Sequence, residues 1–218
     1  PSLYDSFADR PPPLVARQDR FGSTDPEEVV DWVTRRRPES VAVSFAYSFA
    51  DPDDESAVAA ALDGTPVSVS HRVAPEFREF ERASTTVLNA YLQPRLGGYM
   101  QRLTERAETV TEHLQIMRSS GGLMQAIDVA GLAAALLLSG PAGGVVAAAA
   151  LGRAHGYGRL ITFDMGGTST DVCRIEDGRP EVAYERTIDG YVCRMPSVAV
   201  DTVGAGGGSL AWKDAGGS

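Results

Sequence analysis

The run Phe163–Asp171 contains the residue types that bind phosphate groups and divalent metal ions. An apolar strand leads into Asp164, and Gly166 and Gly167 then allow a tight turn whose backbone N–H groups can approach an anion closely. Hydroxyl donors follow the turn at Thr168, Ser169 and Thr170. Asp164 is predicted to hold a hydrated Mg²⁺, which takes few protein carboxylates, and Asp171 returns on the other side of the turn. An ordinary β-hairpin with solvated hydroxyls fits the spacing equally well.

A second candidate anion site is the glycine-rich run Gly204–Ser209, which follows Asp201. Successive N–H groups in such a turn can form a nest for an anion. The residues predicted to take part are Gly204, Gly206, Gly207, Gly208 and Ser209. A flexible Gly-Ser linker is the alternative. Asp201 is predicted either to cap the N–H groups of this loop or to bind a divalent metal ion through hard oxygen ligands.

A run of small residues from Ser139 to Ala150 predicts a helix that packs its backbone close to a neighbouring element or ligand. A core helix between two halves of the protein is the favoured interpretation, since apolar helix faces are usually core. The longer stretch Val129–Gly152 has no charged residue and could by length cross a bilayer. Its many Ala and Gly residues give little insertion energy, so we predict a helix end, a turn and a buried helix, and no membrane span.

Composition excludes several classes of protein. A formal net charge of -9 argues against nucleic-acid binding, which needs clustered Lys and Arg. The one lysine, Lys213, lies between Trp212 and Asp214, so a Walker-type P-loop and Schiff-base chemistry are both unexpected. Cys173 and Cys193 are predicted to be reduced, partly buried thiols. The polar, Pro-rich start lacks an initiator Met and resembles no signal peptide, which favours a cytoplasmic segment of a longer polypeptide.

The hydrophobic pattern around these runs predicts an α/β protein with parts of two domains, residues 1–138 and 139–218. Asp25 is expected to cap a helix that begins at Pro26 and ends near Arg37, with Glu28 closing a capping box. A second helix from Asp51–Pro52 to Gly64 lies between two buried strands, and this β-α-β order indicates a parallel sheet. The other expected elements are strands at 41–45, 67–70, 114–117, 160–163, 170–175, 181–187 and 191–195, a helical stretch at 76–110 interrupted near Pro94 and Gly97–Gly98, a helix at 141–154 and a hairpin turn at Asp177–Gly178.

The other ionisable residues give weaker signals. Nothing in the sequence clusters His71, His113 and His155, so each is predicted to be structural or on the surface. Glutamate and arginine alternate between Glu76 and Arg82 at helical spacing, which usually indicates a solvated helix face. No Gly-x-Ser-x-Gly elbow or Ser-His-Asp arrangement is present to support a serine hydrolase.

The order of the motifs resembles the hydantoinase A/5-oxoprolinase family. The resemblance covers residues 75–209 and is carried by runs in a fixed order. These are Pro75-Glu-Phe-Arg-Glu-Phe-Glu-Arg-Ala-Ser-Thr-Thr-Val-Leu-Asn-Ala-Tyr91, Ser119-Ser-Gly-Gly-Leu-Met124, Ser139-Gly-Pro-Ala-Gly-Gly-Val145, Phe163–Asp171 and Val203-Gly-Ala-Gly-Gly-Gly-Ser209.

The resemblance implies an actin-like ATPase architecture, in which two ribonuclease-H-like domains close over ATP and each supplies a phosphate-binding hairpin. Asp164–Asp171 would be the hairpin of the second domain, and Gly204–Ser209 would lie beside the phosphates. It implies ATP and Mg²⁺ as cofactors, a partner subunit of the hydantoinase B type, and ATP-dependent opening of a cyclic amide such as a hydantoin or 5-oxoproline. An ATP-dependent ketone carboxylase is the alternative enzyme, and a non-catalytic nucleotide-binding module is the alternative outside the enzymes.

The sequence departs from the family pattern at two places. The Asp-x-Gly-Gly-Thr hairpin occurs once, although the family usually opens with another copy, so we expect this segment alone to be inactive. Asp201 stands where many members of the family have His, which leaves the substrate class open.

Overall fold

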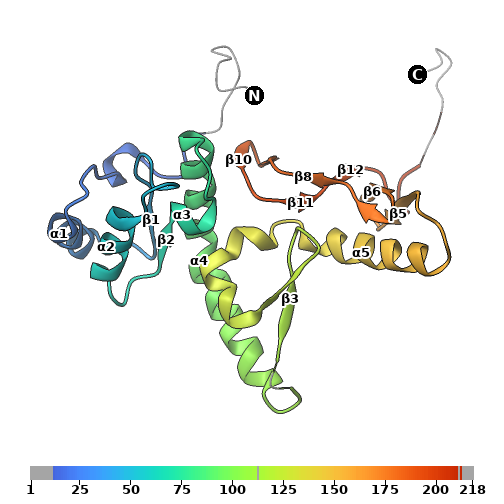
Figure 1. The fold of residues 1–218 in the computed structure, drawn as a ribbon, viewed down its shortest axis with the longest axis horizontal. Helices are drawn as coiled ribbons and strands as arrows, with labels where there is room; N and C mark the ends of the chain where they lie inside the picture. Colours follow the sequence, from blue (N-terminus) through green and yellow to red (C-terminus); the bar gives the residue numbers. More distant parts are fainter. Residues whose placement is uncertain (1–11, 112, 211, 213–218) are drawn as a thin grey trace. The chain divides into compact units, whose positions relative to one another are not determined.

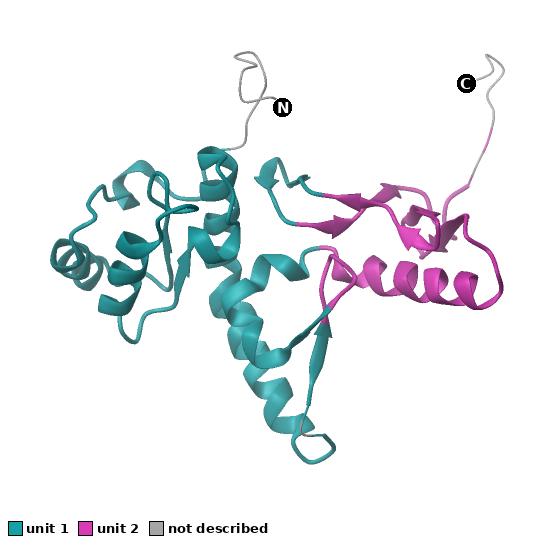
Figure 2. Ribbon diagram, viewed as in Figure 1, with its two compact units in different colours: residues 1–116, 123–137, 184–195 teal, residues 117–122, 138–183, 196–218 magenta. Residues whose placement is uncertain are grey.

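The computed structural model describes residues 12–111, 113–210 and 212, and within it the chain forms two compact units (Figure 2). The first unit takes the chain up to Ile116, together with Leu123–Leu137 and Tyr184–Met195. The second unit takes Met117–Gly122, Leu138–Ala183 and the chain from Pro196 onward. Residues 184–195 therefore belong to the first unit, although the segments before and after them belong to the second.

The first unit begins with a β-α-β arrangement (Figure 1). Its elements are η1 (Arg17–Asp19), α1 (Pro26–Arg36), β1 (Val41–Val43), α2 (Asp53–Ala61), β2 (Val67–Val69) and α3 (Ser70–Val73). Strands β1 and β2 pair in parallel, with Val41 opposite Val67, as the sequence predicted. Val29 and Val33 of α1 pack with Val58 of α2 and with both strands, so this core consists of apolar side chains at helical and strand spacing.

The start of α1 differs in one detail from the predicted capping box. Asp25 caps the helix as expected, since its Oδ1 accepts a 2.9 Å hydrogen bond from the Glu27 N–H. Glu28, however, accepts a hydrogen bond from the Ser23 hydroxyl, and that hydroxyl accepts from the Asp25 N–H. Ser23 therefore stands between the two groups that a capping box joins directly.

Helix α4 (Glu79–Ala107) runs without a break through Pro94 and Gly97–Gly98, so the predicted interruption is wrong. Pro94 cannot donate to the carbonyl of Ala90, four residues earlier, and the Ser40 hydroxyl donates to that carbonyl instead at 2.6 Å. A Cβ atom on Gly97 would lie 3.4 Å from the Cβ of Ala130, so this glycine permits close packing against the next segment. Pro94 and Gly97 are thus accommodated by tertiary contacts.

The charged stretch at the start of α4 is only partly a solvated face. Arg82 is 1% exposed, and the prediction that it lies on a charged surface is wrong. Further along the helix the buried positions continue with hydroxyl and amide side chains at Thr85, Thr86 and Asn89. The Asn89 side-chain amide bonds to the next segment of the chain at two points. Its Nδ2 donates to the Gly131 carbonyl at 3.1 Å, and its Oδ1 accepts from the Ala134 N–H at 2.9 Å.

The rest of the first unit packs along α4. Its elements are β3 (Gln115–Met117), whose last residue belongs to the second unit, β4 (Leu123–Gln125), η2 (Ala126–Asp128), η3 (Ala130–Leu136), β9 (Arg186–Ile188) and β10 (Tyr191–Cys193). The Ser84 hydroxyl donates to the Val192 carbonyl at 2.7 Å, and the Thr85 hydroxyl accepts from the Arg194 N–H at 2.8 Å. Arg194 also forms ion pairs with Glu76 and Glu185. Hydroxyls of α4 therefore hold the β9–β10 hairpin.

The second unit is a small sheet with one helix against it. Its elements are α5 (Ser139–Ala154), β5 (Leu160–Met165), β6 (Thr170–Glu176), β7 (Arg179–Pro180), β8 (Val182–Ala183), β11 (Ser197–Val198) and β12 (Val200–Val203). The antiparallel order is β12-β6-β5, with β7 also on β6 and β8 paired to β11. The predicted turn at Asp177–Gly178 is confirmed, with positive φ at both residues.

The core of the second unit confirms the prediction of a small-residue core helix. Ala142, Val145 and Ala149 of α5 pack on Cys173 and Ile175 of β6. A Cβ atom on Gly152 would collide with the Leu160 side chain, so the missing side chain lets α5 approach β5 closely. The thiols of Cys173 and Cys193 are both buried, as expected, and burial raises the pKa of Cys193 to about 11.

The uncharged stretch forms two separate helical segments. Among the described residues no single helix is long and apolar enough to cross a membrane. Within the same described residues, η3 and α5 would reach that length and composition as a pair, but they are separate helices that end at Leu136 and begin at Ser139.

Candidate functional site

The hairpin β5–β6 carries the first predicted motif. Asp164 lies opposite Asp171 in the register of the two strands, and Gly166–Ser169 forms the loop between them. The Gly166 N–H closes this loop by donating to the Ser169 carbonyl at 2.8 Å. Within the part of the chain that the structure describes, the N–H groups of Gly167, Thr168 and Ser169 have no hydrogen-bond partner. Three backbone donors therefore remain available at the tip of the hairpin.

Both carboxylates of the hairpin lie on the face of the sheet that α5 covers. Side chains alternate along β6, so Asp171 shares a face with Cys173 and Ile175, which are buried against α5. Asp164 pairs with Asp171 and shares that face. A Cβ atom on Gly144 of α5 would lie 3.9 Å from the Oδ2 atom of Asp164. The structure thus brings the small-residue helix next to Asp164.

Thr202 on β12 places a third polar side chain beside the two carboxylates. Thr202 pairs with Asp171 across the strands, and its hydroxyl donates to Asp171 Oδ1 at 2.6 Å. The row Asp164, Asp171, Thr202 therefore crosses three neighbouring strands at the end nearest the hairpin loop. Carboxylate oxygens in such a row suit a hard, hydrated cation such as Mg²⁺. No group of three or more His, Cys, Asp and Glu side chains among the described residues is close enough to surround a metal ion without other ligands.

The second glycine-rich run docks directly on the first. Gly207 donates through its N–H to the Gly166 carbonyl at 2.9 Å, and Gly208 donates to the Gly167 carbonyl at 3.2 Å. The Thr170 hydroxyl donates to the Ala205 carbonyl at 2.6 Å. The two glycine-rich loops, which are far apart in sequence, therefore pack together and form hydrogen bonds with each other.

This docking changes which donors remain for a ligand. The N–H groups of Gly206, Gly207 and Gly208 are all bonded within the protein, the first to the Ser209 hydroxyl at 3.0 Å. The Thr170 hydroxyl is likewise engaged, and its residue is 4% exposed. The Gly204–Ser209 loop thus supports the hairpin loop. Among the described residues of the two loops, the N–H groups without a partner are those of Gly167, Thr168 and Ser169 on the hairpin and that of Gly204.

Asp201 lies on the opposite face of the sheet from Asp164. It pairs with Val172, whose side chain points away from α5, whereas Asp164 pairs with Asp171. One ion cannot therefore contact both carboxylates. Nor does the Asp201 side chain cap the glycine-rich loop, since among the residues described its carboxylate accepts no hydrogen bond from the N–H groups of that loop.

A group of ionisable side chains that sequence reasoning missed lies in the first unit. Glu55 is 0% exposed, and its carboxylate contacts the ring of His71, with 2.7 Å between Oε2 and Nδ1. His71 was expected to be structural or on the surface. The available signal was its position immediately after a strand of a predicted parallel pair, since ligands often bind at the carboxyl ends of such strands.

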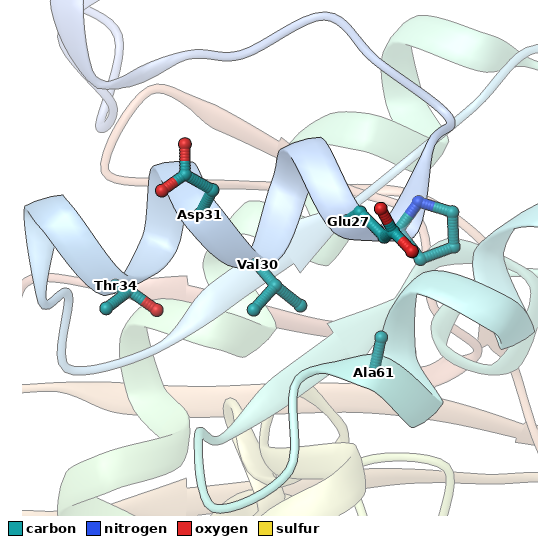
Figure 3. A pocket seen from close by; sticks show the side chains of 6 residues that line it. Glu27, Val30, Asp31, Thr34 and Ala61 are labelled. Carbon is teal, nitrogen blue, oxygen red and sulfur yellow. The ribbon is translucent and has the colours of Figure 1, made fainter.

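An open pocket of about 390 Å³ also occurs in the first unit, between α1 and α2 (Figure 3). Its lining residues are Pro26, Glu27, Val30, Asp31, Thr34 and Ala61. None of them was predicted to belong to a site, and Asp31 forms an ion pair with Arg35 on the helix surface. The pocket brings no convergent set of polar groups together.

The hydantoinase/oxoprolinase family model matches residues 82–218, a range that contains the hairpin and the loop docked on it. This chain belongs to that family. The family resemblance drawn from the sequence is thereby confirmed.

Relatives and solved structures extend the match. The chain is 35% identical to the caprolactamase subunit alpha of Pseudomonas jessenii, over 85% of this chain and 27% of that protein. It is 37% identical to the 5-oxoprolinase of Saccharomyces cerevisiae, over 80% of this chain and 14% of that protein. The crystal structure of the ATP-dependent caprolactamase from Pseudomonas jessenii superposes with a TM-score of 0.77 and 30% identity, over 97% of this chain and 34% of that chain.

A structure of nucleotide-free acetone carboxylase, from work on ATP-dependent acetone carboxylation, also matches, with a TM-score of 0.68 and 27% identity over 87% of this chain and 28% of that chain. These structural matches confirm the α/β fold class with its actin-like ATPase architecture. The chain spans well under half the length of each relative.

Proposed function

We propose that the loop Gly166–Ser169 binds the phosphate groups of ATP and that Asp164 and Asp171 hold its Mg²⁺. The observation that carries the proposal is the set of three unpartnered N–H groups, at Gly167, Thr168 and Ser169, beside the two carboxylates. Backbone donors at a glycine turn bind phosphate without the lysine of a P-loop. The hydroxyls of Thr168 and Ser169 add donors, and neither has a partner among the described residues.

The reaction we propose for the whole protein is ATP-dependent hydrolysis of a cyclic amide of the hydantoin or 5-oxoproline type. ATP would phosphorylate the unreactive carbonyl oxygen and so make the ring open more easily. The residues of this chain would position the phosphates and neutralise their charge, which is the main task of a protein in phosphoryl transfer. The names of the relatives support this choice, since they act on caprolactam and on 5-oxoproline. One of them is a subunit alpha, which supports a partner subunit of the hydantoinase B type.

The second candidate is ATP-dependent carboxylation of a ketone, which the match to acetone carboxylase favours. The hairpin would serve either reaction in the same way. Asp201 is outside the proposed Mg²⁺ site, and its binding of a separate divalent ion stays a prediction.

The decisive experiment uses protein from the complete reading frame, together with its partner subunit. ADP release is measured with hydantoin, 5-oxoproline, caprolactam, and acetone plus bicarbonate. We expect a cyclic amide to stimulate release and to be recovered with its ring opened. Stimulation by acetone with formation of a carboxylated product would replace the first candidate with the second.

The phosphate assignment is tested by Gly167→Val. A Cβ atom on Gly167 meets nothing within 4 Å, so the fold tolerates the substitution while the side chain covers the loop donors. We expect loss of ATP turnover with an unchanged circular dichroism spectrum. Gly22→Val, also in open space but outside the site, is the control and should be silent. Normal ADP release from the Gly167 variant would remove the assignment.

A further inference from the structure

The carboxylate of Glu55 is completely buried in the first unit and is held by four donors. Its Oε1 accepts from the Phe45 N–H at 2.9 Å and from the Ser70 hydroxyl at 2.5 Å. Its Oε2 accepts from the His71 N–H at 3.0 Å and contacts His71 Nδ1 at 2.7 Å. Burial alone would raise the pKa of Glu55, but these hydrogen bonds outweigh it and hold the pKa below its usual 4.5. The carboxylate is therefore ionised and acts only as an acceptor.

Arg82 fixes the surroundings of this carboxylate. Its Nε donates to the Ser70 hydroxyl at 3.0 Å, and its two terminal nitrogens donate to the carbonyls of Glu76 at 2.8 Å and Phe45 at 2.6 Å. Arg82 is 1% exposed, and each nitrogen of its guanidinium has a partner. A satisfied buried network of this kind is rigid, because moving any member leaves a buried polar group without a partner.

The arrangement leaves one nitrogen of His71 for a ligand. An ionised carboxylate can only accept, so the Nδ1 atom carries the proton that it donates to Glu55. In the neutral ring, Nε2 then presents a lone pair. It has no partner among the described residues, and the His71 side chain is 13% exposed. A carboxylate that orients an imidazole through Nδ1 and leaves Nε2 accessible is the arrangement of histidines that act on ligands.

The location of His71 supports a ligand site. Strands β1 and β2 are parallel neighbours, and His71 and Phe45 each lie two residues beyond the end of one of them. Ligands of open parallel sheets bind beyond these carboxyl ends. Tyr47, in the loop after β1, has a φ of 59° and is 70% exposed. An aromatic residue in the left-handed region is strained, and such strain is concentrated at functional sites.

We propose that Nε2 of His71 accepts a hydrogen bond from the ring N–H of a neutral cyclic amide, and so selects amides over ketones. The inference rests on the proposed function and adds a specificity-determining contact to it. A lactam or hydantoin carries an N–H donor next to its carbonyl, whereas a ketone has no such donor. A site that accepts from a substrate N–H discriminates strongly against analogues that lack it, because the buried acceptor is then left unpaired.

The experiment compares His71→Asn with wild type in protein from the complete reading frame with its partner subunit. The Asn amide nitrogen can take the place of Nδ1 and keep the bond to Glu55, while Nε2 is removed. Caprolactam and N-methylcaprolactam are the ligands, and their affinities are measured by calorimetry as well as by turnover. His113→Asn, at an exposed histidine outside this network, is the matched control.

We expect wild type to bind caprolactam at least tenfold more tightly than its N-methyl analogue, and His71→Asn to lose that difference. KM for caprolactam should rise at least tenfold in the variant, with ATP affinity and thermal stability unchanged. Equal binding of the two ligands by wild type, binding of neither, or a His71→Asn variant that retains the discrimination would each overturn the inference. Selective caprolactam binding by wild type without ATP-dependent ring opening would contradict the proposed function alone.

Discussion

Gly206 lies so close to Gly166 that a Cβ atom on Gly206 would stand 2.6 Å from the Gly166 carbonyl oxygen. The same Cβ atom would lie 2.7 Å from the Thr168 nitrogen, one of the three unpartnered donors of the hairpin loop. Backbone atoms cannot yield as a flexible side chain can. The contact therefore links the position of the three unpartnered donors to the glycine-rich loop that follows β12.

The first prediction follows from this contact. Gly206→Ala should displace the hairpin loop and lower the affinity for ATP at least tenfold, which corresponds to about 1.4 kcal/mol. Gly204→Ala is the matched control, because a Cβ atom there meets nothing within 4 Å. Calorimetric titration of both variants with Mg-ATP measures the effect. Equal affinities for the two variants would show that the docked loop does not position the donors.

The second prediction follows from the positions of Asp164 and Asp201 on opposite faces of the sheet. Asp164→Asn removes a negative charge beside Asp171 and should raise the Mg²⁺ concentration needed for half-maximal ATP turnover at least tenfold. Asp201→Asn, on the other face, should leave that concentration within about twofold of wild type, because substitutions away from a site usually have small effects. Magnesium titrations of turnover measure both. The reverse ranking would place the metal on the Asp201 face.

The third prediction compares two adjacent buried threonines of α4. Thr85 and Thr86 are each 0% exposed, and each hydroxyl donates to a carbonyl one turn earlier at 2.7 Å. Only Thr85 also accepts from the Arg194 N–H. Thr85→Val leaves that N–H without a partner and should cost about 1–2 kcal/mol more than Thr86→Val. Urea unfolding measures the difference, and equal costs would mean that the β9–β10 hairpin finds another acceptor.

Local signals in the sequence were enough for much of the fold and for the position of the β5–β6 hairpin that carries the candidate site. The cap at Asp25 and the turn at Asp177–Gly178 depend on residues that are close in sequence, and the parallel β1–β2 pair follows from the order strand, helix, strand. The hairpin loop Gly166–Ser169 could be located from sequence because its glycines and hydroxyls are consecutive, and its binding of phosphate stays a prediction. These features depend on backbone preferences that neighbouring residues set.

Features that depend on distant partners were not predictable from local pattern. Pro94 normally breaks a helix, and it is tolerated in α4 because Ser40 satisfies the carbonyl that it leaves open. Arg82 has the spacing of a surface charge, but Ser70 and the carbonyls of Phe45 and Glu76 make its burial possible. The docking of Gly206 on the hairpin likewise joins residues that no short pattern relates.

The last prediction concerns the acid sensitivity that Glu55 gives to the first unit. Each carboxylate oxygen of Glu55 accepts from two donors. In Glu55→Gln an amide NH₂ replaces one of these oxygens, and it cannot accept from the two donors that it then faces. We expect a loss of about 3 kcal/mol at pH 7, within the range for removing hydrogen bonds to a buried charged group. Glu39→Gln, at an exposed glutamate, is the matched control and should change stability by less than about 0.5 kcal/mol.

The sign of the pH dependence follows from the lowered pKa of Glu55. The unfolded chain binds a proton at this glutamate near its usual pKa of 4.5, while the folded protein binds it only at lower pH. Acidification therefore favours the unfolded state, and the stabilisation by Glu55 is complete well above pH 4.5 and is lost as the pH falls through the folded pKa. The difference in unfolding free energy between wild type and Glu55→Gln should be nearly constant at pH 6 and above, and should shrink from about pH 5 towards pH 3. Urea unfolding across this range measures it, and a difference that stays constant or grows in acid would mean that the Glu55 carboxyl is already protonated in the folded protein.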